Sequence, residues 1–406
     1  MPNFKISLCF SDTGGGHRSA VEAIEAAIKQ ASSENPQAGG FTVSAENIIE
    51  KTHPLNRGFI DLYNYLLRHN QSAMHYYYWF IETFKPNNSE FGYRITGPWL
   101  EKFLEREKPQ VIVSAHPMCN HYLARVLKET KQTGVIKLVT VVTDPNGSFW
   151  RGWACPEADL TLVPNDLGAQ QLIEWGVEPA KIKVVGMPVH PDFSEPAQIS
   201  RHEFLSHLRL SPEKLTVCIN AGWAGGGNML SIYRYLTKAK KDLQIVFLCG
   251  NNTRLYDRMR RETLNHDTPT AVLPFHDRMS DLMNAVDLMV TKAGGLTTFE
   301  ALARKLPLAF DLTSRPMPQE LGTVDLLVEQ NLAYPIKNSE DIVRIIENFV
   351  PQPNRSEVVL PSIHQLNKVY ASSEIARWIM SFCAKSFTPE ASLADQFIEP
   401  NKKFKN

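Results

Sequence analysis

Residues 11–17 (SDTGGGH) form a glycine turn that ends in a histidine. Three consecutive glycines allow positive φ angles and close approach of another molecule to the backbone. The turn lacks the G-K-[ST] ending of a P-loop, and Ser19 breaks the G-x-G-x-x-G spacing of a dinucleotide site. His17 lies where a predicted strand meets a predicted helix, so it could remove a proton from a bound hydroxyl at neutral pH. A helix-capping histidine is the alternative interpretation.

Residues 220–228 (NAGWAGGGN) form a second glycine turn, which also follows an apolar run. Four glycines within six positions indicate a flexible loop that can wrap around a phosphate. A plain turn between two domains is the alternative. Residues 316–320 (PMPQE) form a further polar loop, in which Gln319 and Glu320 offer donors and acceptors suited to sugar hydroxyls.

Residues 291–300 (TKAGGLTTFE) form a third turn, which leads from a predicted strand into a predicted helix. Backbone N–H groups and hydroxyls at the start of a helix can donate to a diphosphate. Glu300 lies at the same mouth, where a carboxylate suits the two hydroxyls of a ribose, although an acid at a helix start is also ordinary. The residues of this turn that could donate hydrogen bonds to a diphosphate are Gly294, Gly295, Thr297 and Thr298.

The elements that must position these turns are short apolar strands that alternate with helical patterns. In the first half, strands are predicted at 5–10, 41–45, 110–114, 137–143, 159–163 and 181–186, and in the second half at 215–220, 243–249, 270–273, 287–291 and 306–310. Continuous apolar strands alternating with helices indicate parallel sheets covered on both faces. Two such series predict two doubly wound α/β domains.

The proline-rich stretch at 188–196 gives the best boundary between these domains. It predicts a first domain at 1–195 and a second at 196–390. A late helix is predicted at 373–385, and its return to the first domain is one option. The polar tail at 391–406 is expected to be disordered.

The composition is that of a globular protein of two domains, since the chain has 406 residues, 43% of them hydrophobic. Lys and Arg together number 43, as do Asp and Glu, and this zero net charge argues against a nucleic-acid-binding protein. The six cysteines form no C-x-x-C pair, which favours buried thiols in a reducing compartment. No apolar stretch approaches the roughly 18 residues that span a bilayer, and an early strand leaves no room for a signal peptide. We therefore expect a cytoplasmic protein.

Residues 53–104 contain no good strand and are rich in aromatic side chains. One interpretation is a helical cap that buries these rings on the first domain. The other is a surface that docks on a membrane interface or a lipid acceptor, where amphipathic rings are favoured. In that case the protein would lie peripherally on the inner face of the cell membrane. The cations facing anionic headgroups would be Arg57, Arg68, His69, Lys85 and Arg94.

Taken in order, these segments resemble a known family. Residues 11–20, above all DTGGGH, look like the opening motif of the monogalactosyldiacylglycerol synthase and processive diacylglycerol glucosyltransferase family, in glycosyltransferase family 28. That family is similar to the peptidoglycan N-acetylglucosaminyltransferase that forms lipid II. The later segments that resemble it are 142–144 (VTD), 163–165 (VPN), 185–189 (VGMPV), 291–295 (TKAGG), 300–302 (EAL) and 318–322 (PQELG).

The resemblance implies a GT-B fold, in which two Rossmann-like domains face each other. It also implies an inverting transfer of a hexose from a UDP-sugar to a membrane lipid such as diacylglycerol. The donor would lie in the second domain and the acceptor in the first. Neither a metal nor a cofactor is expected, and the sequence agrees in having no D-x-D motif.

Carried over by position, the resemblance assigns His17 as the catalytic base and Gly15, Gly16 and Asp144 to the acceptor side. Glu300 would hold the ribose of the donor. The other donor-side assignments are Gly226 and Gly227 at the diphosphate, Phe275 and His276 beside the uracil through their backbone, Arg254 near the nucleotide, and Gln319 and Glu320 on the hexose.

Two segments depart from the family pattern. Members usually carry a His and then a Trp after V-T-D, whereas residues 144–153 (DPNGSFWRGW) contain no His. The family's P-G-Q-E-x-G-N reads MPQELGT at 317–323, and these changes could alter which sugar is accepted. The pattern therefore allows either glucose or galactose as the transferred sugar, and it also allows acceptors other than diacylglycerol.

Two other functions fit the same pattern. One is a UDP-sugar epimerase or hydrolase on the same fold, which the aromatic insertion disfavours because a soluble substrate needs no lipid-docking surface. The other is a non-catalytic sensor of a nucleotide-sugar, which His17 and Glu300 disfavour.

Overall fold

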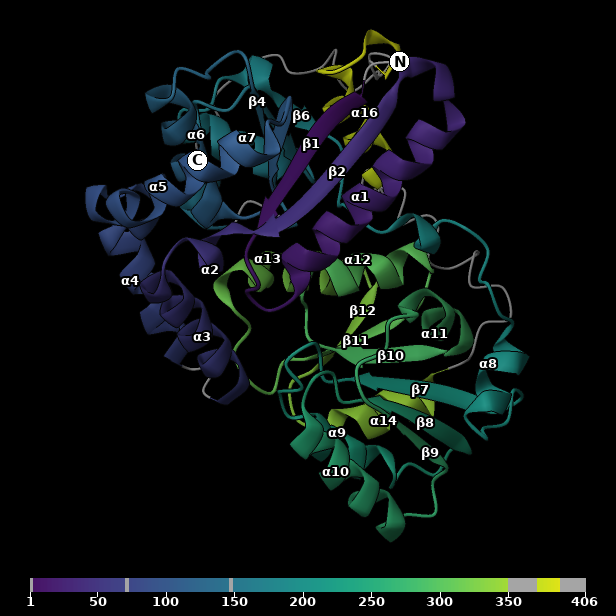
Figure 1. The fold of residues 1–406 in the computed structure, drawn as a ribbon. Coiled ribbons are helices and arrows are strands. Elements are labelled where there is room, and N and C mark those ends of the chain that lie inside the picture. Colours follow the sequence, from purple (N-terminus) through teal and green to yellow (C-terminus); the bar gives the residue numbers. More distant parts are fainter. Residues whose placement is uncertain (1–2, 70–72, 146–148, 350–370, 388–406) are drawn as a thin grey trace, which may run out of the picture.

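The computed structural model describes residues 3–69, 73–145, 149–349 and 371–387. Two six-stranded parallel sheets, one above the other in Figure 1, carry helices on their faces. The strand order is β2-β1-β3-β4-β5-β6 in the first sheet and β12-β11-β10-β7-β8-β9 in the second. Both are open doubly wound sheets, as predicted.

The strands of each sheet follow the chain in two consecutive series. The first sheet contains β1 (Asn3–Phe10), β2 (Gly40–Asn47), β3 (Val111–Ser114), β4 (Lys137–Val141), β5 (Leu160–Val163) and β6 (Ile182–Val184). The second contains β7 (Leu215–Asn220), β8 (Leu243–Leu248), β9 (Thr270–Leu273), β10 (Leu288–Thr291), β11 (Leu308–Asp311) and β12 (Ala333–Ile336). Central strands such as β3 and β7 are buried along their whole length, as strands covered on both faces must be.

The helices divide in the same way, except for the last one. Around the first sheet lie α1 (Gly16–Glu34), α2 (Ile48–Thr52), α3 (Pro54–His69), α4 (Met74–Phe84), α5 (Glu90–Glu107), α6 (Pro117–Glu129), α7 (Asp166–Glu174) and α16 (Ser372–Ser381). The second sheet carries α8 (Arg201–His207), α9 (Met229–Leu236), α10 (Thr253–Glu262), α11 (Met279–Ala285), α12 (Gly295–Ala303), α13 (Pro318–Glu329) and α14 (Asp341–Asn348).

Every strand predicted from the sequence is present, but β12 was not predicted. Its four residues (AYPI) include Pro335, which normally argues against a strand. Proline is tolerated here because β12 is at the edge of the second sheet, where one side of the backbone needs no partner.

The two domains are joined by helices as well as by the chain itself. Helix α16 follows the second domain in sequence but packs on α1, where Ile375, Ile379 and Met380 are buried in the core of the first sheet (Figure 1). Helix α1 also contacts α12, and its Ala20 packs into the core of the second sheet. The helix that begins at the first glycine turn is therefore fixed against both domains.

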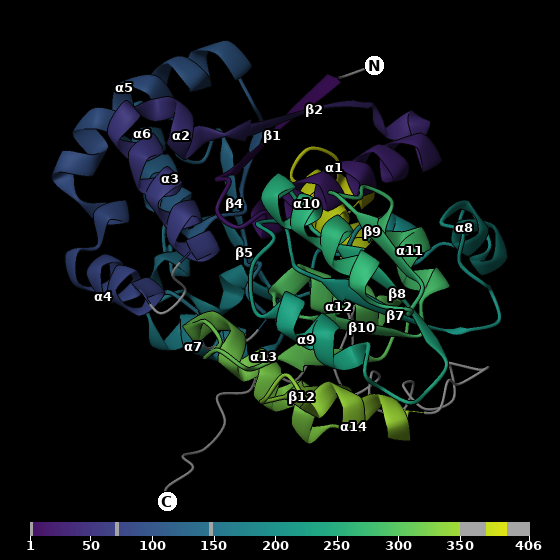
Figure 2. The ribbon, with the colours of Figure 1, turned by 90° about the horizontal axis from the view of Figure 1, so that it is seen from below.

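The aromatic insertion forms three consecutive helices, α3, α4 and α5, beside the first sheet. Figure 2 shows them on the side of the molecule away from α8. Tyr93 and Phe103 of α5 are buried against α6 and the sheet, whereas α3 and α4 bury few side chains. The insertion therefore both caps the domain and leaves aromatic rings exposed.

Candidate active site

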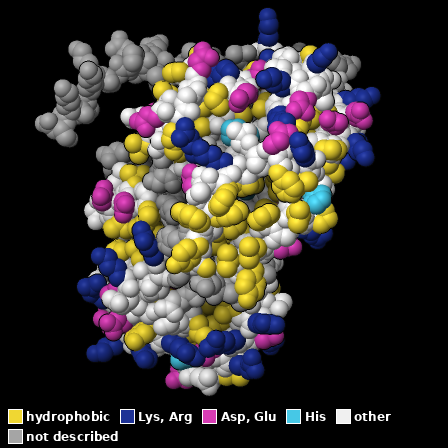
Figure 3. Space-filling model, turned by 90° about the vertical axis from the view of Figure 1, so that its left-hand side faces the viewer, with side chains coloured by type: hydrophobic (Ala, Val, Ile, Leu, Met, Phe, Trp, Pro, Cys, Tyr) yellow, Lys and Arg dark blue, Asp and Glu magenta, His cyan; other side chains and the backbone are white. Residues whose placement is uncertain are grey.

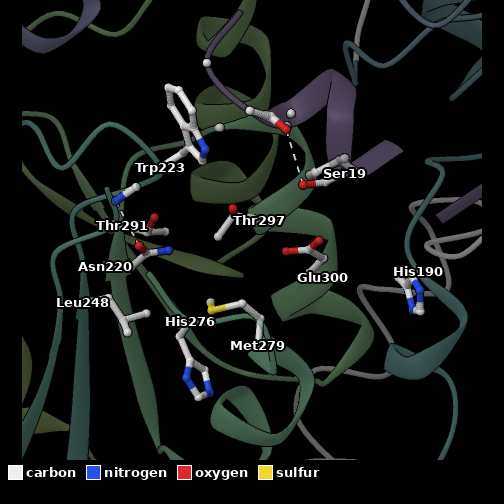
Figure 4. A pocket seen from close by; sticks show the side chains of 18 of the residues that line it. Ser19, His190, Asn220, Trp223, Leu248, His276, Met279, Thr291, Thr297 and Glu300 are labelled. Carbon is white, nitrogen blue, oxygen red and sulfur yellow. Dashed lines mark hydrogen bonds between the residues drawn. The ribbon is translucent and has the colours of Figure 1, made fainter. Parts of the chain in front are cut away.

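A cavity of about 870 Å³ lies where the carboxyl ends of the two sheets face each other. The first domain contributes the turns after β1 and β4, and the second contributes the loops after β7, β8, β9 and β10. Ligands of open α/β sheets bind at the carboxyl ends of the strands, so this cavity is the candidate active site. Figure 4 shows Thr297 and Glu300 of α12 reaching into it, with Ser19 of α1 nearby.

His17 lines this cavity, and one of its ring nitrogens is fixed. Nδ1 lies 2.8 Å from the carbonyl oxygen of Ala115 and 3.0 Å from Oγ1 of Thr143. Because a carbonyl only accepts, Nδ1 carries the proton and Nε2 is left as an acceptor. Burial lowers the pKa of His17 to about 4, so the ring is neutral at pH 7. Nε2 has no hydrogen bond to the described part of the chain and is available to take a proton.

The glycine turn before His17 is held by a side chain of the aromatic insertion. Asn64 of α3 accepts from the N–H of Gly14 at 3.1 Å and donates to the carbonyl oxygen of Asp12 at 2.8 Å. Tyr63 and Leu67, on the same helix, line the cavity. Helix α3 is thus part of the wall of the site.

Asp144 lines the cavity from the turn after β4 and is held by a tryptophan. Its Oδ2 accepts from Nε1 of Trp153 at 2.6 Å, and the Trp153 ring lies 6.1 Å from that of His17. Burial raises the pKa of Asp144 to about 6 in spite of this bond. The segment that lacks the expected His therefore supplies a buried Trp that fixes the Asp144 carboxylate.

Glu300 lines the opposite wall of the cavity, and its carboxylate has no hydrogen-bond partner within the described ranges. Burial raises the pKa of its carboxyl group to about 7, and no neighbouring donor offsets this shift. Burying a carboxylate without hydrogen-bond donors is costly. This arrangement suits a ligand that brings paired hydroxyl groups.

Lys292 is a site residue to which sequence reasoning gave no role. It directly follows β10, where burial lowers the pKa of its ammonium group, although the carboxylates of Glu320 and Asp311 act in the opposite sense. Among the described residues none forms an ion pair or a hydrogen bond with this ammonium group. Its side chain passes under the second glycine loop, since a Cβ on Gly227 would lie 2.7 Å from its Cε. Burying an unpaired ammonium is expensive, so Lys292 calls for an anionic ligand. Its position between a glycine loop and a helix start was the available signal.

Glu320 lies in the first turn of α13 and faces the same part of the cavity as Lys292. Its Oε2 accepts from the N–H of Met317 at 3.0 Å, and burial raises its pKa, although Lys292 acts in the opposite sense. Its other oxygen forms no hydrogen bond to the part of the chain that the structure describes and can serve a bound ligand. The side chain of Gln319 lies outside the described residues.

The other predicted donor-side residues divide into two groups. Gly226, Phe275, His276, Gly294, Gly295 and Thr297 line the cavity, as do Gly15 and Gly16 on the acceptor side. Arg254 is exposed on α10, Gly227 is exposed and does not line the cavity, and Thr298 is fully buried. Neighbouring residues of a helix point about 100° apart, so Thr297 and Thr298 cannot both face the site.

One group of side chains outside the cavity has the composition of a metal site. Among the described residues, His121, Cys155 and Glu157 place their ligand atoms within 4.8 Å of one another. Burial raises the pKa of the Cys155 thiol to about 12, and Glu157 is exposed. None of the three lines the cavity, so the chemistry derived below does not involve them.

A second surface feature lies on the aromatic insertion. Most of the large hydrophobic side chains that are exposed in the described residues belong to α3, α4 and α5, and Figure 3 shows hydrophobic side chains gathered across this face. Arg57, Lys85 and Arg94 are exposed on the same helices, while the side chains of Arg68 and His69 are not described. None of the described helices is both long and apolar enough to cross a membrane. The members of this aromatic face are Leu55, Phe59, Leu62, Tyr65, Tyr76, Trp79, Phe84 and Phe91.

Two models of known protein families match parts of this chain. The family model described as monogalactosyldiacylglycerol (MGDG) synthase matches residues 17–189, and the glycosyltransferase family 28 C-terminal domain matches residues 228–310. The chain is therefore similar to MGDG synthases in its first part and to glycosyltransferase family 28 in its second. Its two matched regions correspond to the two sides of the cavity, with His17 in the first and Glu300 in the second.

Relatives named as MGDG synthases and as a diacylglycerol glucosyltransferase align along most of this chain. It is 28% identical to MGDG synthase 1 of Arabidopsis thaliana, over 91% of this chain and 69% of that protein. It is 28% identical to a probable MGDG synthase of Glycine max, of whose length it spans only 65%. It is 24% identical to a processive diacylglycerol beta-glucosyltransferase of Bacillus pumilus, over 92% of this chain and 94% of that protein.

Similarity to solved structures places this chain in the GT-B fold. Acinetobacter baumannii MurG matches with a TM-score of 0.56 at 14% identity, over 93% of this chain and 99% of that one. A putative UDP-N-acetylglucosamine 2-epimerase of Listeria monocytogenes matches with a TM-score of 0.59 at 13% identity, over 96% of this chain and 99% of that one. Transferases and epimerases share the architecture, so the side chains must distinguish between them.

Proposed function

We propose that this protein transfers a hexose from a UDP-sugar to the hydroxyl group of a membrane lipid, such as diacylglycerol, with inversion at the anomeric carbon. The observation that carries the proposal is the fixed tautomer of His17, which presents an unprotonated Nε2 to a cavity whose other wall holds unpaired Glu300 and Lys292. The first domain would hold the acceptor, and the second the donor. The names of two relatives, an MGDG synthase and a processive diacylglycerol beta-glucosyltransferase, support diacylglycerol as the acceptor.

The chemical step begins at the acceptor hydroxyl. Its oxygen attacks the anomeric carbon from the side opposite UDP, and its proton passes to Nε2 of His17. As the new C–O bond forms, the bond between the anomeric carbon and the diphosphate oxygen breaks, and the electron pair leaves with UDP. The imidazolium that results is stabilised by the carbonyl oxygen of Ala115, which accepts from Nδ1–H.

The departing UDP requires positive charge at its diphosphate. Lys292 supplies a cation beside the second glycine loop, and the start of α12, where Gly294 provides no side-chain cap, supplies backbone N–H groups. Glu300 accepts from the two ribose hydroxyls, and Phe275 and His276 flank the uracil. Because Lys292 and the N–H groups of α12 supply the positive charge that a divalent cation would otherwise provide, we propose transfer without a metal or cofactor. Undiminished activity in a chelator would support this, and restoration by added Mg²⁺ would contradict it.

The hexose lies between the two walls in this arrangement. We assign Glu320, through its oxygen not held by Met317, and Gln319 to the hexose hydroxyls. Asp144 faces Glu320 closely enough for the two charges to interact, and it would accept from the acceptor lipid or from the sugar. These groups do not distinguish glucose from galactose.

A lipid acceptor is favoured because one helix belongs to both the cavity and the aromatic face. Tyr63 and Leu67 of α3 line the cavity, while Phe59, Leu62 and Tyr65 of the same helix are exposed. A lipid held at the aromatic face could therefore present its polar end to His17 while its chains stay in apolar surroundings. We propose peripheral attachment to the cytoplasmic face of the membrane through this surface.

A screen of UDP-hexoses against diacylglycerol and a total lipid extract, with products read by mass spectrometry, tests the assignment. We expect one UDP-hexose to give a hexosyl lipid together with UDP. Incubation of the same UDP-hexoses without lipid is the control, because a sugar isomer formed there would favour an epimerase, and free hexose a hydrolase. Binding of a UDP-sugar without any product would favour a sensor.

A further inference from the structure

His116 is a buried histidine that contacts the catalytic candidate but has no role in the mechanism above. It is 4% exposed, and its ring centroid lies 4.3 Å from that of His17. It caps α6, since its Nδ1 accepts from the N–H of Met118 at 3.1 Å. Burial, together with the neighbouring His17, holds the pKa of His116 well below its usual range, so the ring is neutral.

The capping bond determines where the single ring proton of His116 lies. A backbone N–H only donates, so Nδ1 must be unprotonated and Nε2 must carry the hydrogen. Nε2 lies 2.9 Å from Oγ1 of Thr13, and it therefore donates to that hydroxyl. The Thr13 oxygen is thus an acceptor towards the protein interior.

The hydrogen of the Thr13 hydroxyl then has to point elsewhere. Thr13 lines the cavity, is partly exposed and forms no second hydrogen bond within the described ranges. A hydroxyl that already accepts from a buried donor is free to donate its own hydrogen. Thr13 therefore presents a donor to the cavity, on the same glycine turn from which His17 presents an acceptor.

We propose that Thr13, oriented by His116, recognises a second oxygen of the acceptor, next to the hydroxyl that His17 deprotonates. This rests on the proposed function and narrows its acceptor class to lipids whose reacting hydroxyl has an ester, ether or hydroxyl oxygen beside it. A simple long-chain alcohol offers His17 a proton but offers Thr13 nothing. Thr13 is a specificity-determining residue, and His116 is its positioning residue.

The test compares a 1,2-diacylglycerol with a long-chain primary alcohol as acceptors, using Thr13→Val, Thr13→Ser and His116→Asn. Valine keeps the shape of threonine but removes the hydroxyl, and asparagine can still cap α6 but is too short to reach Thr13. We expect T13V and H116N to lower kcat/KM for diacylglycerol about tenfold, the equivalent of one neutral hydrogen bond, and to leave the alcohol unchanged. T13S should keep the preference for diacylglycerol.

The outcomes separate this inference from the proposed function. Equal losses on both acceptors, or an unchanged preference in T13V, would overturn the role of Thr13 while leaving the transferase assignment intact. If the wild-type protein glycosylated neither acceptor with any UDP-hexose, the role of Thr13 and the transferase assignment would both be wrong. Binding of UDP-hexose by each variant, which does not involve Thr13, checks that the protein has folded.

Discussion

The first glycine turn (residues 11–17) meets the second (residues 220–228) at Gly15 and Trp223. Gly15 has a φ of +87°, and a Cβ built on it would lie 2.9 Å from Cγ of Trp223. Trp223 belongs to the loop after β7 in the second domain, so this contact crosses the cleft between the two domains. Glycine is needed here both for the backbone angle and for the approach of the indole ring.

Substitution of Gly15 by Ala should therefore destabilise the protein for two separable reasons. Gly134 provides the comparison, because it has a φ of +82° but nothing within 4 Å of its Cβ position. We expect G134A to cost about 1 kcal/mol of unfolding free energy for the backbone alone, and G15A about 2–4 kcal/mol because Trp223 must also move. Gly16 lacks both constraints, so G16A should unfold at the wild-type denaturant concentration. Equal effects of G15A and G134A would contradict the importance of the contact.

Replacement of His17 by Ala should remove the base but not the donor site. We expect turnover to fall about 10²–10⁴-fold while the Kd for UDP changes less than about twofold, because the donor residues belong to the other domain. Steady-state transfer assays and calorimetry with UDP measure the two quantities. His202→Ala, at an exposed position on α8, is the matched control. Transfer at the wild-type rate by H17A would exclude His17 as the base.

Donor binding should depend on pH through Glu300. Burial raises the pKa of its carboxyl group to about 7, and only the ionised form accepts from both ribose hydroxyls. Affinity must therefore be lost as pH falls through about 7, with the Kd for UDP-glucose rising up to tenfold per unit below it. UDP-glucose is a better probe than UDP, because the terminal phosphate of UDP itself titrates at about pH 6.

The variant Glu300→Gln tests whether Glu300 causes this pH dependence of UDP-glucose binding. It should bind UDP-glucose about tenfold or more weakly at pH 8, since a hydrogen bond to a charged group is worth about 1.5–3 kcal/mol. Between pH 6 and 8 its Kd should be nearly constant. A wild-type pH dependence that persists in E300Q would assign the titration to another group.

Lys292→Met should weaken binding of the diphosphate and spare the nucleoside. Loss of a charge-assisted contact predicts a Kd for UDP about 10–150-fold higher, and an unchanged Kd for uridine, which has no phosphate. The control Lys240→Met removes an exposed lysine of the same domain. Equal weakening of UDP and uridine would mean that Lys292 supports the loop and does not contact the phosphates.

The aromatic face should determine attachment to lipid vesicles. Tyr76, Trp79 and Phe84 of α4 are 77%, 63% and 59% exposed, so their joint replacement by Ser removes surface hydrophobicity without opening the core. We expect the affinity for anionic vesicles, measured by flotation, to fall at least about tenfold. Each inserted ring contributes about 1.5–3 kcal/mol to the free energy of binding when it is fully buried. Serine at Leu264 and Val135, which are 84% and 72% exposed elsewhere, is the control. Equal binding by both variants would refute docking through this face.

Local patterns in the sequence were sufficient for the architecture and for most of the cavity lining. Apolar runs alternating with helical patterns predict parallel sheets, and a glycine turn after a strand predicts a loop at its carboxyl end. The edge strand β12 was missed because Pro335 conceals it, and its tolerance depends on its place in the sheet. The inward position of Thr298 and the distant position of Arg254 likewise depend on how α12 and α10 pack.

The sequence by itself determined which residue types stand after which strands: His17, Glu300 and Glu320 in turns that any doubly wound fold brings to the same edge. Only the tertiary structure decided their chemical states. The tautomer of His17 is set by Ala115, 98 residues away in the chain, and the charges of Glu300 and Lys292 are perturbed by burial and left unpaired. Hydrogen-bond partners and desolvation arise from contacts between distant segments, and no local pattern encodes them.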